Sequence, residues 1–224
     1  MYSDVSEKPF MYVPKNFEQS DIEVLHDLIV SHPLATLVTM SSNGINANHI
    51  PLHLVKDKGQ YGALQGHVAR ANPLWSDLDN KVETLIIFQG PNSYITPSWY
   101  PTKQEQGKVV PTWNYVTVHA YGRLDVIDDP VWVKSQLELL TAQQEASFDK
   151  PWAVSDAPVE FTNKMISAIV GIEILITKLA GKWKVSQNQP ALNQAGVVEG
   201  LKSLSNSEAT KVAALVEKAS QNAH

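Results

Sequence analysis

The sequence predicts a mainly β, α+β fold: a small antiparallel β-barrel with peripheral helices. Six or seven apolar or alternating segments follow one another at the spacing of hairpin-connected strands. Turn residues separate them, and Asn43-Gly44 is a strong signal for a tight hairpin turn. Segments with helical periodicity stand before and after the strands. Short strands joined by turns, with helices at the ends, are typical of a small barrel with helical additions.

The composition excludes several classes of protein. The 224 residues suffice for one large domain or two small ones, and a hydrophobic content of 43% supports a real core. No segment is apolar for long enough to span a bilayer, and no secretory signal is evident. The absence of cysteine excludes disulfides and thiolate chemistry and suits a cytoplasmic protein. A net charge of -5 makes nucleic acid an unexpected partner.

The first half of the chain predicts one helix followed by strands. Residues 1–10 are expected to be an extension. Ser20 is the expected N-cap of an amphipathic helix over residues 20–31, with Glu23 completing a capping box and Pro33 ending the helix. A short helix is expected over 70–78 and a turn over 89–92. Strands are predicted over residues 34–40, 45–55, 61–67 and 82–88.

The second half contains the clearest alternation, over Val116–Val126. Its even-numbered residues are apolar and its odd-numbered residues are mostly polar, so one face of this strand is expected to meet water, a site or an interface. Asp129-Pro130 predicts a helix start, and Ser205 or Ser207 predicts another. A strand is expected over 172–176, and helices over residues 161–169, 192–204 and 207–220.

Residues 95–115 combine aromatic rings with prolines. The prolines exclude a helix, because each removes an amide donor and fixes its own backbone angle. Trp99 and Tyr100 form one cluster, Trp113 and Tyr115 another, and the polar segment 103–108 between them is expected to be an exposed loop. The rings offer a wall for a planar aromatic ligand; the alternative is an aromatic loop packed on a core.

Two polar segments offer further contacts for a ligand. Gly66–Pro73 leaves a predicted strand and contains Arg70, a planar double donor suited to phosphate; the alternative is an ordinary surface ion pair. Gly181–Asn188 combines two lysines with an indole and could close over a polar ligand, whereas the alternative is a solvated strand end.

Several chemistries find no support in the sequence. His49 and His53 are expected on one strand, where about 13 Å would separate them, and with His67 they lack a recognised metal-ligand spacing. We therefore expect no metal site. No Gly-x-Ser-x-Gly or Gly-x-Gly-x-x-Gly motif is present. A catalytic acid or base is not identified, since His67 and His119 are better explained as structural or phosphate-contacting.

Six motifs follow one another along residues 11–200: Met11–Lys15, His49–Leu52, Gly66–Pro73, Pro97–Tyr100, Val110–Tyr115 and Ser186–Asn188. Taken together and in this order, they resemble the PaiB family of FMN-binding negative transcriptional regulators. This family is similar to the flavin-binding split-barrel superfamily, so the resemblance implies a split antiparallel β-barrel and leaves residues 201–224 as a helical tail.

The resemblance also implies a homodimer with FMN at the subunit boundary. The phosphate would contact residues after a central strand, the flavin ring would lie against residues 48–52, and aromatic residues would enclose it. The cofactor-binding residues implied in this way are Asn48, His49, Ile50, Pro51, Leu52, His67, Arg70, Asn72, Trp99, Tyr100, Trp113, Asn114, Ser186, Gln187 and Asn188.

Three functions remain open from the sequence. The first is a flavin-binding regulator or FMN-dependent oxidoreductase, in which the cofactor supplies the chemistry. The second is a DNA-binding transcriptional repressor, against which the acidic charge and the lack of a basic recognition helix argue. The third is a haem-binding split barrel with His49, His67 or His119 as the axial ligand.

Overall fold

The computed structural model describes residues 11–79 and 81–221, so the predicted extension over residues 1–10 lies outside the described residues. No helix among the described residues is long and apolar enough to cross a membrane. The strands are β1 (Glu18–Gln19), β2 (Leu34–Ser41), β3 (Gly44–Pro51), β4 (His53–Val55), β5 (Ala63–Ala69), β6 (Thr84–Ile95), β7 (Thr112–Ile127) and β8 (Ile169–Lys184). The α-helices are α1 (Ile22–Ser31), α2 (Lys103–Gln106), α3 (Pro130–Glu145), α4 (Val159–Ser167), α5 (Ala191–Ser203) and α6 (Ser207–Gln221).

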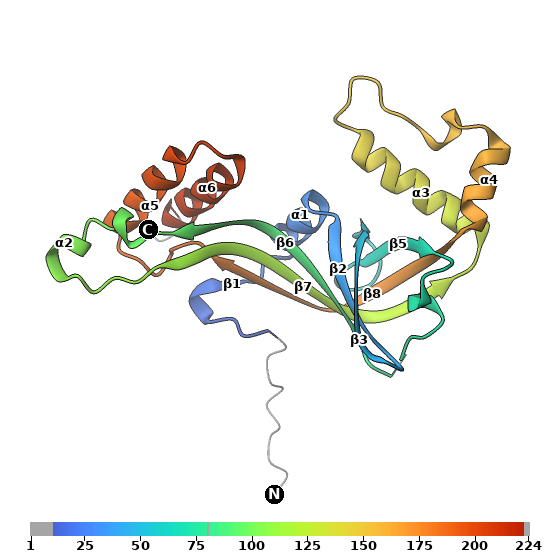
Figure 1. Ribbon diagram of the computed structural model, residues 1–224, viewed down its shortest axis with the longest axis horizontal. Helices are drawn as coiled ribbons and strands as arrows, with labels where there is room; N and C mark the ends of the chain where they lie inside the picture. The colour runs from blue at the N-terminus through green and yellow to red at the C-terminus, as the bar shows by residue number, and fades with distance from the viewer. Residues whose placement is uncertain (1–10, 80, 222–224) are drawn as a thin grey trace, which may run out of the picture. The chain divides into compact units, whose positions relative to one another are not determined.

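These strands form one eight-stranded sheet in the order β3-β2-β6-β7-β8-β5-β4, with β1 paired to β8 (Figure 1). The pairs β2–β3, β2–β6, β4–β5, β5–β8 and β1–β8 are antiparallel. The predicted fold class, an antiparallel sheet with peripheral helices, is therefore confirmed.

The chain divides into two compact units. Unit 2 comprises residues 21–88 and 118–179, and unit 1 comprises residues 1–20, 89–117 and 180–224. The three longest strands, β6, β7 and β8, each contribute residues to both units. The predicted boundaries at residues 10 and 200 remain predictions.

Two glycines shape the sheet of unit 2: Gly44 forms a tight turn, and Gly66 lets the chain after β3 approach β5. The predicted hairpin turn is confirmed between β2 and β3, where Gly44 adopts a left-handed φ of 103° that favours glycine. At the other end of the strand order, a Cβ on Gly66 would lie 2.7 Å from Leu52 Cδ2 and 3.1 Å from Pro51 O. The chain leaving β3 therefore passes directly over β5, an approach that only a residue without a side chain permits.

The helix starts follow capping rules, with two corrections. Asp129 accepts a 2.8 Å hydrogen bond from Val131 N at the start of α3, as predicted. The cap of α1 is Asp21 rather than Ser20, because the Asp21 carboxylate accepts from Glu23 N at 3.0 Å. Asn206, and neither Ser205 nor Ser207, accepts from Ala209 N at 2.7 Å at the start of α6.

Four other local predictions were wrong. The turn expected over 89–92 is strand, and Pro91 lies in β6 beyond the residues that pair with β2. The strand expected over 45–55 is interrupted at Leu52, which places His49 and His53 on different strands. The helix expected over 70–78 is one 3-10 turn, η2 (Pro73–Trp75). One helical turn, α2, interrupts the expected loop 103–108.

The alternation of β7 is confirmed for its even-numbered residues from Val116 to Leu124, all of which are buried. The opposite face is mixed. Thr117 and Tyr121 are buried, whereas Arg123 and Asp125 are exposed. The polar face of this strand is therefore partly covered by the fold itself.

Candidate functional site

The predicted cofactor residues divide between the two units. Eight of them, from Asn48 to Asn72, belong to unit 2, and seven, from Trp99 to Asn188, belong to unit 1. Within each unit the structure joins some of these residues directly and leaves others apart.

In unit 2, Asn48 of β3 and Asn72 are brought together. Asn72 caps η2 by accepting from Leu74 N at 2.9 Å, and its amide nitrogen donates to Asn48 Oδ1 at 2.9 Å. Asn48 in turn donates to Asn46 Oδ1 at 3.1 Å. Ile50 and Leu52 are buried core residues, while His49 and Pro51 are exposed on the sheet-edge strand β3.

Arg70 is largely engaged by the protein. Its guanidinium forms a bidentate pair with Asp128, at 2.6 and 3.0 Å, and donates to the carbonyls of Ser167 and Ile169 at 3.0 and 3.1 Å. These contacts use four of its five N–H groups and leave one, on Nη1. Hydrogen bonding to Arg70 holds the pKa of Asp128 below its ordinary value. The surface ion pair is thus present, and a phosphate contact by Arg70 stays a prediction.

His67 and His53 both face glutamines of α3. His67 Nδ1 lies 2.9 Å from Gln136 Oε1, and His53 Nδ1 lies 2.7 Å from Gln143 Oε1. Since an amide oxygen only accepts, each histidine donates through Nδ1 and keeps Nε2 for another partner. Gln136 is 1% exposed, and its Nε2 has no hydrogen-bond partner in the described part of the chain. Sequence reasoning missed these partners, because they lie 69 residues from His67 and 90 residues from His53 along the chain.

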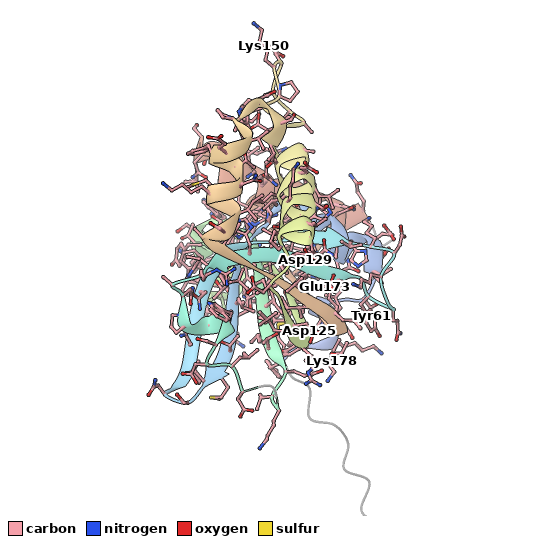
Figure 2. The ribbon with its side chains drawn as sticks, turned by 90° about the vertical axis from the view of Figure 1, so that its right-hand side faces the viewer. Tyr61, Asp125, Asp129, Lys150, Glu173 and Lys178 are labelled. Carbon is pink, nitrogen blue, oxygen red and sulfur yellow. The ribbon has the colours of Figure 1, made fainter. Side chains whose placement is uncertain are left out.

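A carboxylate network on β8 was also missed. Glu173, labelled in Figure 2, is 9% exposed and accepts from Lys58 Nζ at 2.6 Å and from Gln65 Nε2 at 2.7 Å. Gln65 is its cross-strand neighbour on β5, which explains the contact. Both carboxylate oxygens are satisfied, so the network reads as structural.

In unit 1, Trp99 and Tyr100 pack beneath α5. A Cβ on Gly196 or Gly200 would come closer than 3.0 Å to the Trp99 carbonyl oxygen or indole, respectively, so the helix can lie on this tryptophan only because both positions are glycine. Tyr100 is 3% exposed, and burial raises the pKa of its phenol. Trp99 and Tyr100 also line a 740 Å³ pocket along the same helix.

The end of β8 holds a second buried contact. Asn114 donates to Ser186 Oγ at 2.8 Å, and both side chains are buried. Ser186 adopts a φ of 62°, which is unusual for a residue other than glycine. Gln187 stabilises this bend by accepting from Val185 N at 2.7 Å and donating to Trp183 O at 2.5 Å, whereas Asn188 is exposed. β8 ends at Lys184, but Gly181, Val185 and Ser186 are buried, so the segment is not the solvated strand end considered as the alternative.

Around Trp113 lies a group that we call the lysine–aromatic cluster: Tyr12, Tyr94, Trp113, Tyr115, Lys182 and Lys184. Trp113 is 54% exposed and meets Tyr94 edge to face, with ring centroids 5.9 Å apart. Lys182 Nζ lies 5.6 Å from the ring centroids of both Tyr12 and Tyr115. Sequence reasoning did not include Tyr94 among the candidate residues, because the predicted strand ended at residue 88. Extending that strand to Ile95, as in β6, would have included Tyr94.

Lys184 adds a second cation to this cluster. Its Nζ donates to Trp113 O at 2.7 Å and to Thr112 Oγ1. Burial, and then the nearby charge of Lys182, lower the pKa of Lys184. An accessible indole beside two lysines is suited to a planar ligand that carries negative charge.

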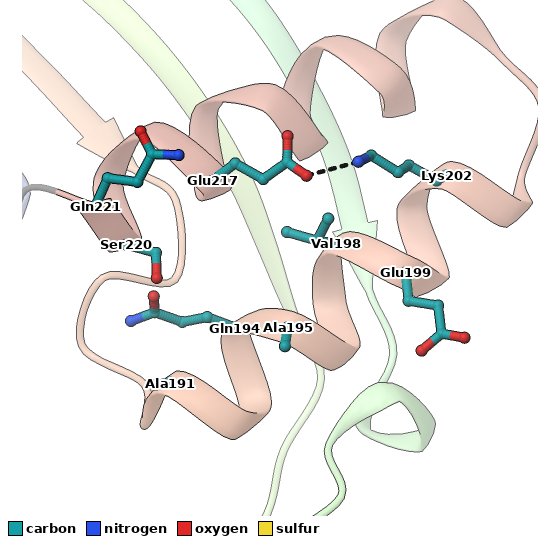
Figure 3. Close-up of a pocket in the computed structure, with 9 residues that line it drawn as sticks. All are labelled: Ala191, Gln194, Ala195, Val198, Glu199, Lys202, Glu217, Ser220 and Gln221. Atoms are coloured by element: carbon teal, nitrogen blue, oxygen red, sulfur yellow. Dashed lines mark hydrogen bonds and ion pairs between the residues drawn. The ribbon is translucent and has the colours of Figure 1, made fainter.

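A further pocket, of 530 Å³, lies between α5 and α6 (Figure 3). An ion pair of 2.6 Å between Lys202 and Glu217 joins the two helices at this pocket (Figure 3). None of the predicted cofactor residues lines it. Across residues 11–79 and 81–221, no group of three histidine, aspartate or glutamate side chains could hold a metal ion.

Comparison with known proteins assigns the family. The model of a family described as "Putative FMN-binding domain" matches residues 11–178. Protease synthase and sporulation protein PAI 2 of Bacillus subtilis is 30% identical over 92% of this chain and 97% of its own length. An uncharacterized protein of Emericella nidulans, AN0679, is 34% identical over 87% of this chain and 91% of its own.

Two solved structures show the same fold. The flavocytochrome Anf3 of Azotobacter vinelandii matches with a TM-score of 0.57 at 14% identity, over 79% of this chain and 74% of that one. An FAD and heme binding protein of Mycobacterium smegmatis matches with a TM-score of 0.55 at 16% identity, over 75% and 73%. The split-barrel prediction is confirmed at the level of the fold. With the family model covering most of its length, the chain belongs to the PaiB family of FMN-binding domain proteins.

Proposed function

We propose that this chain binds FMN as a homodimer and that the lysine–aromatic cluster contacts the cofactor. The observation that carries the proposal is the accessibility of Trp113, which is 54% exposed beside Lys184 and edge to face with Tyr94. The indole provides an apolar surface for the isoalloxazine ring, and the two lysines provide charge for the phosphate. The other predicted cofactor residues remain part of the proposal. Arg70 can contribute only one N–H to the phosphate, because its other four are used within the protein.

Bound FMN would supply hydride and electron transfer. The protein's own residues bind and orient it: the rings of the cluster exclude water from one side, while Lys182 and Lys184 hold the anion. We propose that the activity is that of a flavin-dependent oxidoreductase or a flavin-responsive regulator located in the cytoplasm.

The test is the visible spectrum of the purified protein, followed by titration of the stripped protein with FMN. Trp113→Ala should raise the Kd for FMN about tenfold, which corresponds to about 1.4 kcal/mol. Trp152→Ala is a matched control, because Trp152 is 47% exposed and has no place in the cluster. Absence of FMN uptake by the unmodified chain refutes the proposal, and equal Kd values for the two variants remove Trp113 from it.

An indirect role in regulation is favoured over direct DNA binding by the charge balance of 18 basic against 23 acidic residues. Oxidation of NADH or NADPH by the FMN-loaded protein tests the redox role. A gel-shift assay at low salt tests the regulatory one, and sequence-specific binding there would overturn the indirect role.

The homodimer is supported by two exposed apolar side chains of unit 2, one on the edge strand β3 and one at the start of β2. Ile45 of β3 is 77% exposed and Leu34 of β2 is 64% exposed, which favours burial against another surface. Light scattering after size exclusion should give twice the chain mass of 24.8 kDa. Ile45→Glu should shift this mass towards the monomer, and a monomeric unmodified chain would contradict the proposal.

Haem is a second candidate ligand because His67 Nδ1 is held by Gln136 Oε1, which leaves Nε2 able to coordinate iron. Hemin titration should then give a haem absorption band that His67→Ala abolishes. No such band with the unmodified protein eliminates this candidate.

A further inference from the structure

Three asparagines of unit 2 form a hydrogen-bonded chain that ends at a small pocket. Leu74 N donates to Asn72 Oδ1 at 2.9 Å, Asn72 Nδ2 donates to Asn48 Oδ1 at 2.9 Å, and Asn48 Nδ2 donates to Asn46 Oδ1 at 3.1 Å. We call Asn46, Asn48 and Asn72 the asparagine chain. It connects the cap of η2 to the middle of β3.

The backbone fixes the direction of this chain. Leu74 N–H can only donate, so the atom of Asn72 that it meets is the amide oxygen. Asn72 therefore presents its NH₂ group to Asn48, and Asn48 presents its own to Asn46. The amide nitrogen of Asn46 is left at the end of the chain, without an acceptor among the described residues.

The end of the chain lies at a pocket of 160 Å³. Asn46 lines this pocket together with Thr39, its cross-strand partner on β2, so their side chains emerge side by side from one face of the sheet. Thr39 is only 5% exposed, and its hydroxyl has no hydrogen-bond partner in the described part of the chain. Two polar groups with unused hydrogen-bonding capacity thus meet at one small cavity.

The negative charge at the pocket disfavours an anionic ligand and favours a neutral one. Asp77 lines it and accepts from Ser42 N and Ser42 Oγ at 3.1 and 2.8 Å, and no lysine or arginine of the described residues lines it. An anion would meet the Asp77 carboxylate without a compensating cation. A neutral carbonyl can accept from Asn46 and Thr39, and an adjacent N–H can donate to Asp77. The volume holds roughly five water molecules at ~30 Å³ each, which is the size of one small ring.

We propose that this pocket binds the amide or imide edge of a small neutral ring. Such an edge is found in free pyrimidines and in the pyrimidine end of a flavin. If the ring is that of a flavin, the pocket helps to select FMN, and the inference then rests on the proposed function. If the ring is a free pyrimidine, the inference is independent of that function.

Uracil serves as the probe, and binding is followed by NMR of the ¹⁵N-labelled protein. We expect a Kd of about 1 mM, as befits a ligand of this size, with shifts of the Asn46 side-chain amide. Asn46→Asp keeps the shape but presents an acceptor, and should weaken binding at least tenfold. Thr39→Val should weaken it about threefold to tenfold. Asn163→Asp, an exposed substitution on α4, is the matched control and should leave the Kd unchanged.

Asn72→Asp gives the sharper test, because it acts from the far end of the chain. Aspartate still caps η2, but it offers Asn48 only an acceptor. Asn48 and Asn46 should then both turn over, so that Asn46 presents its carbonyl to the pocket and uracil binding is lost. Melting temperatures close to that of the unmodified protein establish that the variants are folded.

Each outcome separates the possibilities. Loss of uracil binding in Asn46→Asp and Asn72→Asp, but not in Asn163→Asp, supports the proposal. Absence of uracil binding together with an unchanged FMN affinity in Asn46→Asp overturns it and leaves FMN binding at the lysine–aromatic cluster intact. If FMN does not bind but uracil does, the proposed function fails and the pocket stands as a pyrimidine site. A weaker FMN affinity in Asn46→Asp identifies the flavin as the source.

Discussion

Arg70 and Lys182 are both cations beside aromatic rings, but the fold treats their charges differently. The Arg70 guanidinium lies 6.0 Å from the Trp75 ring centroid and is paired with Asp128. Lys182 lies between two tyrosine rings and forms no ion pair with a carboxylate among the described residues. The difference teaches that a residue type suggests a ligand contact, whereas the partners inside the fold decide whether its charge remains available.

The two cations of the lysine–aromatic cluster also influence each other. Like charge from Lys182 contributes to the lowered pKa of Lys184, which means that the protonated form of Lys184 is held less firmly than in water. A bound anion would relieve this repulsion. Binding an anion would bring no such relief at Arg70, because Asp128 already neutralises the guanidinium charge. The pKa of Arg70 is accordingly raised above its ordinary value.

Charge reversal at Lys182 should produce the largest change. Lys182→Glu removes one cation and places a carboxylate at the cluster, so the Kd for FMN should rise about 30-fold at low salt. Isothermal titration measures this, with Lys150→Glu as the control: Lys150 lies at the outer end of the loop between α3 and α4 (Figure 2). An equal effect from both substitutions would show that net charge, and not the cluster, governs binding.

Removal of the second cation should have a smaller and pH-dependent effect. Lys184→Met should weaken FMN binding about tenfold at pH 7. Because the pKa of Lys184 is lowered, its proton is lost at a lower pH than the 10.5 of an ordinary lysine. The difference in Kd between the unmodified protein and Lys184→Met should therefore shrink as pH rises towards 10. A constant difference across that range would exclude Lys184 as the titrating group.

Arg70 should matter less for the cofactor than for the fold. Arg70→Lys loses the bidentate geometry and the two carbonyl contacts, so the melting temperature should fall while the Kd for FMN changes by about twofold or less. Thermal unfolding and FMN titration of the same sample distinguish the two effects. A tenfold loss of FMN affinity with an unchanged melting temperature would restore Arg70 as the principal phosphate contact.

The smallest effect is expected for Asp128→Asn, as a pH-dependent change in the stability of the fold. The pKa of Asp128 is below 3.8 in the folded state, so its pairing stabilises the fold above pH 3.8 and is lost as pH falls through the folded pKa. Asp128→Asn should therefore be less stable than the unmodified chain near neutral pH, and the two should converge in strong acid. Urea unfolding at a series of pH values measures the difference. A difference in stability that stays constant down to the lowest pH would show that it does not arise from the ionised form of Asp128.

Local patterns predicted the parts of the fold that depend on neighbouring residues. The burial of the even-numbered residues from Val116 to Leu124, the Asn43-Gly44 turn and the Asp129-Pro130 helix start each depend on spacing within a few residues, and each is present. The strand through Gly90-Pro91 was missed because the tolerance of a proline depends on which strands pair beside it.

The candidate site was less accessible to prediction because its contacts join distant parts of the chain. Arg70 meets Asp128 across 58 residues, and Asn114 meets Ser186 across 72. Motif resemblance identified Arg70, Asn72 and Asn114 as candidates without revealing their partners. Nothing in the spacing of Asn46, Asn48 and Asn72 indicates that a backbone amide aligns all three.

The packing of α5 on Trp99 has a practical consequence for work with shortened chains. The family match ends at residue 178, which invites removal of everything beyond it. Gly196 and Gly200 lie beyond that limit, and they cover the Trp99 carbonyl and indole. A chain cut at the family boundary would expose a tryptophan to solvent and favour precipitation. If the other five tryptophans were replaced, a red shift of the Trp99 fluorescence would report whether α5 is docked.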